Sequence, residues 1–327
     1  MKIAISRTDN IGDVVLTFPM TGLLKEYFPD AEIIWIGKQY TQPVVESCRY
    51  VNKFYLLEDF LNYCKSEETI DLDAIIHVFP QFSLAQLAAR ARIRMRIGTS
   101  HRWFHWLYCN KLVHFGRKNS SFHEAQLNIF LLKPLVNKKI LLSWEEIAHL
   151  YGFVAPQEEI NAINQEKFVI LHPKSRGSAR EWALANYLSL VEIFEKQGVK
   201  CFITGTQAEG AALAQQCPHL LQHSNVVNFT GKLNLKQLIA LISKSLGLIA
   251  CSTGPLHIAA ALGKPTVGIY PPIRPMHPGR WAPIGLKATF LAVEKNCNAC
   301  RKSMQCACVN AIKPQEVVTA FEKLCSK

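Results

Sequence analysis

The 327-residue sequence has no apolar run that approaches the roughly 20 residues needed to span a bilayer. Its first residues, Met1 to Ile5, read as a short strand and lack the longer apolar core of a signal peptide. No G-x-G-x-x-G pattern follows a strand-like segment, which argues against a nicotinamide-dependent oxidoreductase. Low-complexity segments and short-period repeats are also missing. We therefore expect a cytoplasmic globular protein.

Cysteine is present in number, but its pattern does not fit the common frameworks. The chain has 11 cysteines and is far longer than the small secreted domains that depend on disulfides. Seven are scattered, and we expect them to be buried as small apolar side chains. The other four are Cys297, Cys300, Cys306 and Cys308. Only one residue separates the last two, which fits a structural zinc site poorly, so we expect no bound metal.

Acidic residues are scarce relative to basic ones, and the formal net charge is +12. This charge suggests an acidic partner: nucleic acid, an anionic lipid surface or a phosphorylated substrate. No acidic residue occurs from Arg90 until Glu124, and aromatic residues are interleaved among the basic ones. Such a stretch could bind nucleic acid, could hold a phosphorylated lipid headgroup, or could be a solvated basic face. Its members are Arg90, Arg92, Arg94, Arg96, Arg102, Trp103, Phe104, Trp106, Tyr108, Lys111, Arg117 and Lys118.

Strand-like and helix-like segments alternate along the chain, which indicates parallel sheets wound with helices. The length suits two domains of about 150 residues each. A polar, aperiodic linker at residues 157–166 predicts a first unit of residues 1–160, a second of 161–312 and a last helix in 313–327. The clearest strands are residues 2–6, 32–37, 53–57, 74–78, 168–172, 200–204, 225–229, 246–250 and 266–270, and the clearest helices are 14–27, 84–92, 235–243 and 314–325.

A tight polar loop, residues 7–13, separates the first strand from the first helix. Loops of this kind carry reactive groups at the carboxyl edge of a sheet in α/β folds. Asp13 lies at the first turn of the helix, where it could act chemically or could merely compensate the helix dipole.

Two segments of the second half suggest phosphate binding. After the strand at 246–250, Ser252 or Thr253 could cap a helix that opens at Gly254 and Pro255. The free N–H groups at such a helix start attract anions, although a cap without a ligand is the plainer interpretation. The loop at residues 173–182 is small and basic. Its Lys174, Arg176 and Arg180 could reach a pyrophosphate and its Ser175 and Ser178 could donate to it, unless it is only a mobile surface loop.

Four segments together resemble glycosyltransferase family 9, the lipopolysaccharide heptosyltransferases. Residues 10–19 are similar to the family's G-D-V-x-x-x-x-P opening, and residues 252–261 to its D-T-G-P-x-H-x-A-A-A segment. Residues 172–182 resemble its H-P-G-x-x-x-x-K-x-W segment, and residues 93–98 its R-I-G segment. The resemblance covers nearly the whole chain.

The resemblance implies a fold of GT-B type, in which two Rossmann-like α/β lobes face one another across a cleft. It implies transfer of heptose from ADP-heptose, with inversion and without a metal or cofactor, onto an anionic lipid-linked inner-core acceptor. Asp13 would be the catalytic base. The donor-binding residues would be Lys174, Ser175, Arg180, Glu209, Ser252, Thr253, Gly254 and His257, and the acceptor-binding residues Arg94, Arg96 and Arg102. The last helix would lean back onto the first lobe, and the protein would be peripheral at the inner face of the inner membrane.

Two departures from the family pattern matter. Ser252 replaces an Asp that the relatives use at the donor-sugar hydroxyls, so a different nucleotide sugar remains an alternative. Arg180 replaces the phosphate-contacting Lys and keeps its charge. Glu209 could contact the ribose or could only begin a helix. A nucleic-acid-binding protein would explain the net charge but leaves Asp13 without a role, and we prefer the headgroup interpretation of the basic stretch.

Overall fold

The computed structural model describes residues 1–67, 69–117, 120–136, 140–160, 167–293, 297 and 306–326. The chain divides into two compact units, Met1–Val154 and Ala155–Lys327, and this division falls a few residues before the predicted one. None of the helices in the described ranges has both the length and the apolar character that crossing a membrane requires.

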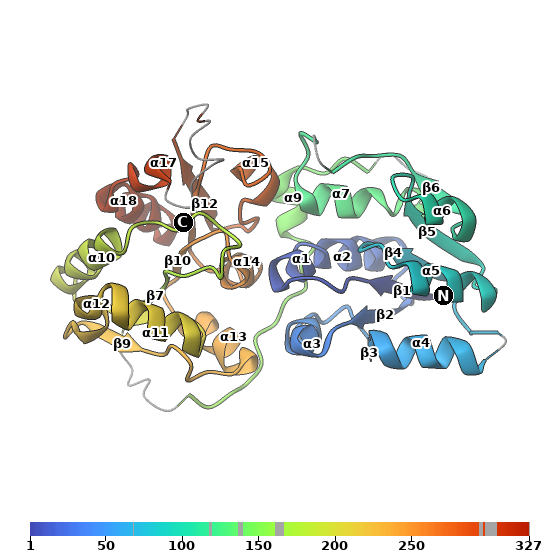
Figure 1. Ribbon diagram of the computed structural model, residues 1–327, viewed down its shortest axis with the longest axis horizontal. Coiled ribbons are helices and arrows are strands. Elements are labelled where there is room, and N and C mark those ends of the chain that lie inside the picture. Colours follow the sequence, from blue (N-terminus) through green and yellow to red (C-terminus); the bar gives the residue numbers. More distant parts are fainter. Residues whose placement is uncertain are drawn as a thin grey trace. The chain divides into compact units, whose positions relative to one another are not determined.

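The first unit is built on a six-stranded parallel sheet in the order β3-β2-β1-β4-β5-β6 (Figure 1). Its strands are β1 (Lys2–Ser6), β2 (Glu32–Gly37), β3 (Lys53–Leu56), β4 (Ala74–His77), β5 (Met95–Thr99) and β6 (Lys111–Val113). The described helices are α1 (Ile11–Val15), α2 (Phe18–Tyr27), α3 (Gln42–Glu46), α4 (Leu57–Ser66), α5 (Phe82–Arg90), α6 (Trp103–Tyr108), α7 (Glu124–Phe130), α8 (Lys133–Val136) and α9 (Trp144–Ala148), with a 3-10 turn η1 (Gln39–Thr41).

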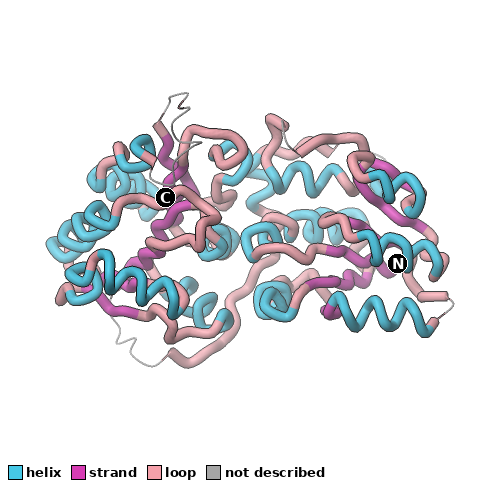
Figure 2. Tube along the Cα trace, viewed as in Figure 1, coloured by secondary structure: helices cyan, strands magenta, loops and turns pink. Residues whose placement is uncertain are grey.

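The second unit repeats this plan with a parallel sheet in the order β12-β11-β10-β7-β8-β9. Its strands are β7 (Phe168–His172), β8 (Lys200–Ile203), β9 (Val226–Asn228), β10 (Leu248–Cys251), β11 (Thr266–Tyr270) and β12 (Ala288–Ala292). The described helices are α10 (Leu184–Lys196), α11 (Gln207–Gln216), α12 (Pro218–Gln222), α13 (Leu235–Lys244), α14 (Gly254–Ala261), α15 (Pro278–Trp281), α17 (Ala307–Asn310) and α18 (Pro314–Cys325). Figure 2 shows the helices around the strands of each sheet.

The central strands are apolar along their whole length because helices cover both faces of a parallel sheet. In β1, Ile3, Ala4 and Ile5 are fully buried, and β7 and β10 are buried at every position. This continuous burial explains why these strands stand out in the sequence. The expected pair of doubly wound parallel sheets is confirmed.

One predicted helix is divided in two. The apolar spacing of residues 14–27 predicted a single helix, but α1 ends at Val15 and α2 begins at Phe18. Pro19 has no N–H to donate to the carbonyl oxygen of Val15, and its ring would clash with that carbonyl, so the first helix cannot continue. The Thr17 hydroxyl instead donates to the carbonyl oxygen of Asp13, at 2.8 Å.

The last helix, α18, packs within the second unit, and its expected contact with the first lobe stays a prediction. The apolar face of α18, including Val317, Phe321 and Leu324, is buried in the core of the second unit. This helix contacts α10, β11 and β12, and the Phe194 and Phe321 rings meet edge to face at 5.8 Å. Its apolar surface is therefore used within its own unit.

Both sheets have the same strand order, and each therefore has a switch point. In the first unit the chain winds outward in opposite directions from β1 and β4, and in the second unit from β7 and β10. Ligands of open α/β sheets bind outside the carboxyl ends of the strands at such a point. The loops that follow these four strands are therefore where a site is expected.

Candidate functional site

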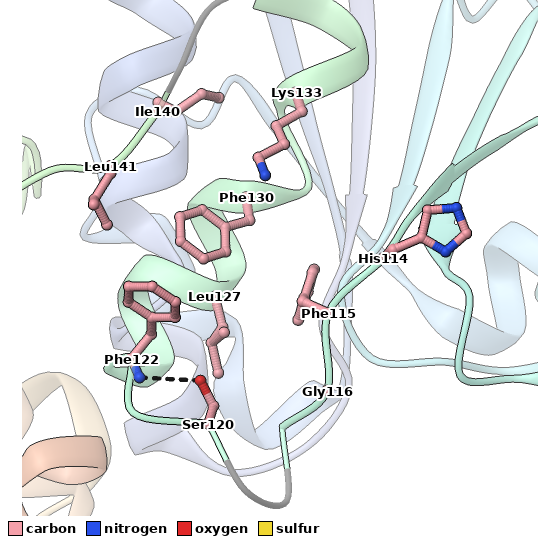
Figure 3. Close-up of a pocket in the computed structure, with 10 residues that line it drawn as sticks. All are labelled: His114, Phe115, Gly116, Ser120, Phe122, Leu127, Phe130, Lys133, Ile140 and Leu141. Carbon is pink, nitrogen blue, oxygen red and sulfur yellow. Dashed lines mark hydrogen bonds between the residues drawn. The ribbon is translucent and has the colours of Figure 1, made fainter.

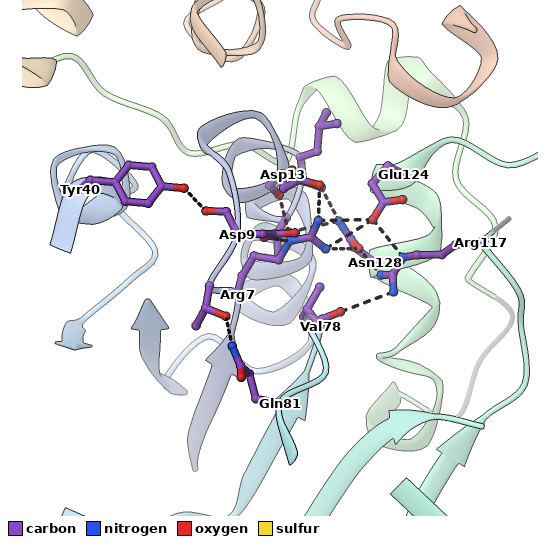
Figure 4. Close-up of polar contacts among 12 residues, drawn as sticks. Arg7, Asp9, Asp13, Tyr40, Val78, Gln81, Arg117, Glu124 and Asn128 are labelled. Carbon is purple, nitrogen blue, oxygen red and sulfur yellow. Dashed lines mark hydrogen bonds and ion pairs between the residues drawn. The ribbon is translucent and has the colours of Figure 1, made fainter. Parts of the chain in front are cut away.

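The loop after β1 holds Asp13 against a buried arginine. Asp13 lies in the first turn of α1, and its Oδ1 forms an ion pair with Nη2 of Arg7 (Figure 4). The Arg7 side chain is only 3% exposed, whereas that of Asp13 is 15% exposed. Within the described residues no hydrogen bond reaches Oδ2 of Asp13. One carboxylate oxygen is thus fixed, and the other can accept a proton.

Arg7 is shared by three carboxylates. Its Nε donates to Oδ1 of Asp9 at 2.7 Å, and its Nη1 lies 3.4 Å from Oε1 of the buried Glu124. Burial alone would lower the pKa of Arg7, but the charges of Asp13, Asp9 and Glu124 raise it above its ordinary value. Buried charges persist when they are paired and hydrogen-bonded, and Arg7 meets both conditions.

Helix α7 completes this arrangement, which we call the Arg7 cluster. Arg117 donates from Nε to Oε1 of Glu124 at 3.0 Å and from Nη2 to Oδ1 of Asn128 at 2.8 Å. Asn128 in turn donates from Nδ2 to the Leu16 carbonyl oxygen at 3.1 Å. The cluster comprises Arg7, Asp9, Asp13, Arg117, Glu124 and Asn128. It therefore fixes the start of α1 to α7.

Asp9 is the carboxyl group of the cluster with a raised pKa. Burial raises the pKa of Asp9 to about 6, the charge of Asp13 adds to this effect, and Arg7 opposes it. The Asp9 backbone carbonyl oxygen also accepts a hydrogen bond from the Tyr40 hydroxyl. On the other side of the loop, Gln81 donates from Nε2 to Oγ1 of Thr8 at 2.9 Å, which ties the segment after β4 to that after β1. The cluster thus lies at the switch point of the first sheet.

In the second unit the segment after β10 opens α14 as predicted, with Pro255 in the first turn and Gly263, at φ +70°, after the last turn. The expected side-chain cap is absent from this described segment: neither Ser252 nor Thr253 forms one. The Thr253 hydroxyl is buried and has no hydrogen-bond partner among the described residues. An unsatisfied buried hydroxyl at the start of a helix is suited to an incoming anion.

Ser252 lies next to a buried tyrosine. Burial raises the pKa of Tyr270, and a hydrogen bond with the Ser252 side chain opposes that shift. The Tyr270 hydroxyl also donates to the Trp281 carbonyl oxygen. His257, one turn into α14, is buried. The side chain at position 252 therefore lies beside Tyr270 of β11.

The basic loop after β7 is folded around a carboxylate. Glu181 accepts from Lys174 Nζ at 2.5 Å, from the Ser175 N–H at 2.9 Å and from the Ser175 hydroxyl at 3.0 Å. Arg180 is buried and Arg176 is exposed. Lys174 and Ser175, two of the predicted phosphate ligands, therefore lie close together, and the Glu181 carboxylate accepts their hydrogen bonds.

Glu209 caps its own helix. Its Oε2 accepts from the Thr206 N–H at 2.7 Å, while the Thr206 hydroxyl accepts from the Glu209 N–H at 3.3 Å. This capping box supports the helix-start interpretation. A ribose contact stays a prediction.

The predicted acceptor residues do not share one role. Arg94 and Arg102 are exposed. Arg96 donates from Nε to the Tyr108 carbonyl oxygen at 2.7 Å and from Nη1 to that of Ile93 at 2.5 Å, so it fastens β5 to the end of α6. Arg117, from the same basic stretch, belongs to the Arg7 cluster.

The cysteine expectations are resolved in part. Of the seven scattered cysteines, five are buried, Cys217 is partly buried and Cys325 is exposed. Cys306 and Cys308 are buried in the apolar core of the second unit, whereas Cys300 lies outside the described residues. The expectation of no bound metal stays a prediction.

A separate pocket of about 360 Å³ lies beside α7 (Figure 3). Leu127 and Phe130 of α7 line it together with Phe115, Phe122 and Lys133. It contains none of the predicted site residues. Its rings and aliphatic side chains make it mainly apolar.

Sequence reasoning missed Arg7, Asp9, Arg117, Glu124 and Asn128 as members of a site. Two signals were present in the sequence. Arg7 directly follows a strand and precedes carboxylates by two and six positions, and Glu124 ends the stretch without acidic residues. Neither signal shows that residues 7 and 124 meet, because that contact depends on how α7 packs.

Comparisons with known proteins show the family to which this sequence is similar. A profile of glycosyltransferase family 9 (heptosyltransferase) matches residues 68–310. The lipopolysaccharide core heptosyltransferase OpsX of Haemophilus influenzae is 23% identical over 82% of this chain and 78% of that protein. Lipopolysaccharide heptosyltransferase 3 of Escherichia coli is 22% identical over 79% of each chain.

Solved structures show the same fold. The ADP-heptose LPS heptosyltransferase II of E. coli superposes with a TM-score of 0.78 at 18% identity, covering 100% of this chain and 99% of that one. The E. coli heptosyltransferase WaaC, solved with ADP, gives a TM-score of 0.74 at 14% identity, covering 99% of this chain and 100% of that one. The GT-B type of fold is thereby confirmed.

Proposed function

The chain belongs to glycosyltransferase family 9, the heptosyltransferases, and we propose that it transfers heptose from ADP-heptose to a lipopolysaccharide inner-core acceptor with inversion. The observation that carries this proposal is the Arg7 cluster, in which Arg7 holds one oxygen of Asp13 and leaves the other available. Asp13 removes the proton from an acceptor hydroxyl, which attacks the anomeric carbon as the bond to the diphosphate breaks. A general base of this kind contributes about 100- to 10,000-fold to a rate.

The leaving nucleoside diphosphate carries developing negative charge. The first-turn N–H groups of α14, the Thr253 hydroxyl and the charges of Lys174 and Arg180 are the groups we assign to it. Fixed donors aimed at developing charge stabilise a transition state because they need no reorganisation. ADP bound to WaaC supports an adenine nucleotide as the product.

A related enzyme using a different nucleotide sugar is the second candidate. Ser252 favours it, because a neutral hydroxyl stands where the family pattern has a carboxylate. The reaction, the base and the diphosphate site would be the same. We further propose action at the inner face of the inner membrane, without a nucleic-acid partner.

Thermal unfolding with a panel of ADP- and UDP-sugars tests the proposal. A ligand at about 100 times its Kd adds roughly 2.7 kcal/mol of stability, so a true donor should raise the Tm by a few degrees. We expect ADP-heptose to give the largest shift and to be converted to ADP when an inner-core acceptor is added. A protein that responds to none of these sugars, yet binds duplex DNA with strong salt dependence, would contradict the proposal.

A further inference from the structure

Helix α6 exposes an unusual amount of apolar surface. Trp103, Leu107 and Trp106 are 67%, 67% and 60% exposed, more than any other large apolar side chain in the described residues. Their spacing of three and four positions brings them to one side of the helix. Phe82 of α5, 43% exposed, adjoins them, with its ring 5.7 Å from that of Trp103. We call Phe82, Trp103, Trp106 and Leu107 the α6 face.

The α6 face is held in place by its surroundings. The Trp106 indole N–H donates to the Ser100 carbonyl oxygen at 2.9 Å, and Trp103 meets Phe104 edge to face at 5.9 Å. Phe104 and His105, on the other side of the helix, are buried. Ordered aromatic side chains lose little further conformational entropy when a partner covers them.

Exposed cations flank this face at both ends of α6. Arg102 precedes the helix and Lys111 follows it, and both are exposed, as are Arg90 and Arg94. The Asn110 side chain donates to the Arg94 carbonyl oxygen at 2.9 Å, which ties the end of α6 to the start of β5. No acidic residue occurs from residue 74 to residue 123. Every charged residue in the stretch of chain that carries the α6 face is therefore basic.

We propose that the α6 face docks on an anionic phospholipid bilayer, with its aromatic and aliphatic side chains in the interface and the flanking cations on lipid phosphates. Tryptophan is enriched at membrane interfaces, and basic residues beside an apolar helix face strengthen binding to anionic lipids. Single-stranded nucleic acid would also attract cations and aromatic rings. Leu107, as exposed as Trp103, cannot stack on a base but can insert among acyl chains, so the bilayer fits better.

This inference rests on the proposed function in one respect, since it explains how a lipid-linked acceptor comes to Asp13. Phe82 directly follows Gln81, which binds Thr8 in the loop of the Arg7 cluster. Trp103 begins α6 just after β5 ends, at the same carboxyl edge of the sheet. A bilayer on the α6 face would thus lie near the edge that carries the proposed base.

Vesicle binding tests the docking without donor, acceptor or turnover, so its failure is distinct from failure of the proposed transfer. The probes are vesicles of phosphatidylglycerol with phosphatidylcholine, vesicles of phosphatidylcholine alone, and a single-stranded oligonucleotide. We expect binding to the anionic vesicles and a blue shift of tryptophan emission. Replacing Trp103, Trp106 and Leu107 together with Ser should weaken binding by more than about tenfold. Leu107→Asp alone gives a second test if the triple variant does not fold.

Matched controls separate the α6 face from general surface effects. The double variant Arg90→Gln with Lys111→Gln should weaken vesicle binding by roughly fivefold per charge removed. The control is Lys196→Gln with Lys323→Gln, which removes the same charge from exposed positions of the second unit and should not weaken binding. Leu286→Ser removes an apolar side chain that is 53% exposed and should also have no effect. Vesicle binding that survives both the triple variant and Leu107→Asp would overturn the proposal. So would binding to the oligonucleotide but not to vesicles.

Discussion

At the scale of single residues, the Arg7 cluster gathers the charged groups at the switch point of the first sheet. Two arginines, Arg7 and Arg117, face three carboxylates, of which only Asp9 and Asp13 are measurably exposed, at 16% and 15%. Glu124 is 1% exposed and reaches no solvent. We interpret Glu124 as the residue that positions the arginines, and Asp9 and Asp13 as the carboxylates of the cluster that solvent reaches.

Asp9 makes stability depend on pH in a defined window. Burial raises the pKa of Asp9 to about 6, above the value of about 4 for an unfolded chain. The folded protein therefore binds this proton more tightly than the unfolded chain does. The resulting contribution to the free energy of unfolding is full below about pH 4 and is lost as pH rises through about 6. We expect the free energy of unfolding of the wild type to fall by up to roughly 3 kcal/mol, relative to that of Asp9→Asn, as pH rises across this window.

Urea unfolding of both proteins at several pH values measures this difference. Asp30→Asn, which removes an exposed carboxylate from the same unit, is the control and should show no comparable trend. A stability difference between wild type and Asp9→Asn that does not vary with pH would contradict the assignment.

Ser252 is the residue at which sugar choice can be tested. A charged acceptor forms hydrogen bonds about twice as strong as a neutral one, so Ser252→Asp should shift kcat/KM toward ADP-heptose by about tenfold. Ser252→Asn introduces a side chain that has the shape of Asp but not its charge, so it should not produce this shift. If wild type and both variants rank a panel of nucleotide sugars identically, position 252 does not set sugar choice.

At the scale of elements, strand-to-helix loops carry the proposed donor site. The loop after β7 is organised by Glu181, whose carboxylate accepts from Lys174 and Ser175. A bound diphosphate would need the same donors. Under the proposed function, the Glu181 carboxylate would compete with the diphosphate for these donors.

Glu181→Gln should tighten the binding of ADP by about threefold to tenfold, because the Lys174 ammonium would no longer be paired with a carboxylate. Isothermal titration calorimetry measures the change, and Lys174→Gln should weaken binding. Glu192→Gln makes the same change of charge at an exposed position of α10 and is the control. If Glu181→Gln weakens ADP binding as much as Lys174→Gln does, the carboxylate builds the loop and does not compete with the ligand.

The elements themselves were largely predictable from the sequence. Strands such as β1, β2, β7 and β11 match the predicted ranges because their burial on both faces leaves continuous apolar runs. The division between α1 and α2 could have been predicted from Pro19, whose missing N–H ends the first helix. The missing cap at Thr253 could not have been predicted, because the residue type alone does not show where its hydroxyl points.

At the scale of the whole molecule, the two units share one strand order. In each unit a candidate site lies at the switch point of the sheet. The sequence predicted both loops, since each carries a local motif. It did not predict the Arg7 cluster, because residues 7 and 124 are far apart in the chain and meet only through the packing of α7 beside α2. Nor did it predict that α18 packs in its own unit, because an apolar helix face does not identify the surface that covers it.

The central claim is that Asp13 is the base of a sugar transfer, and single-turnover kinetics of Asp13→Asn with ADP-heptose and an inner-core acceptor tests it most directly. We expect the rate constant to fall by about 100- to 10,000-fold, because the acceptor hydroxyl would lose its base. The Kd for ADP-heptose should stay nearly unchanged, since the proposed donor ligands lie in the second unit. An unchanged rate in a folded Asp13→Asn protein, or a comparable loss in Asp9→Asn alone, would contradict the account.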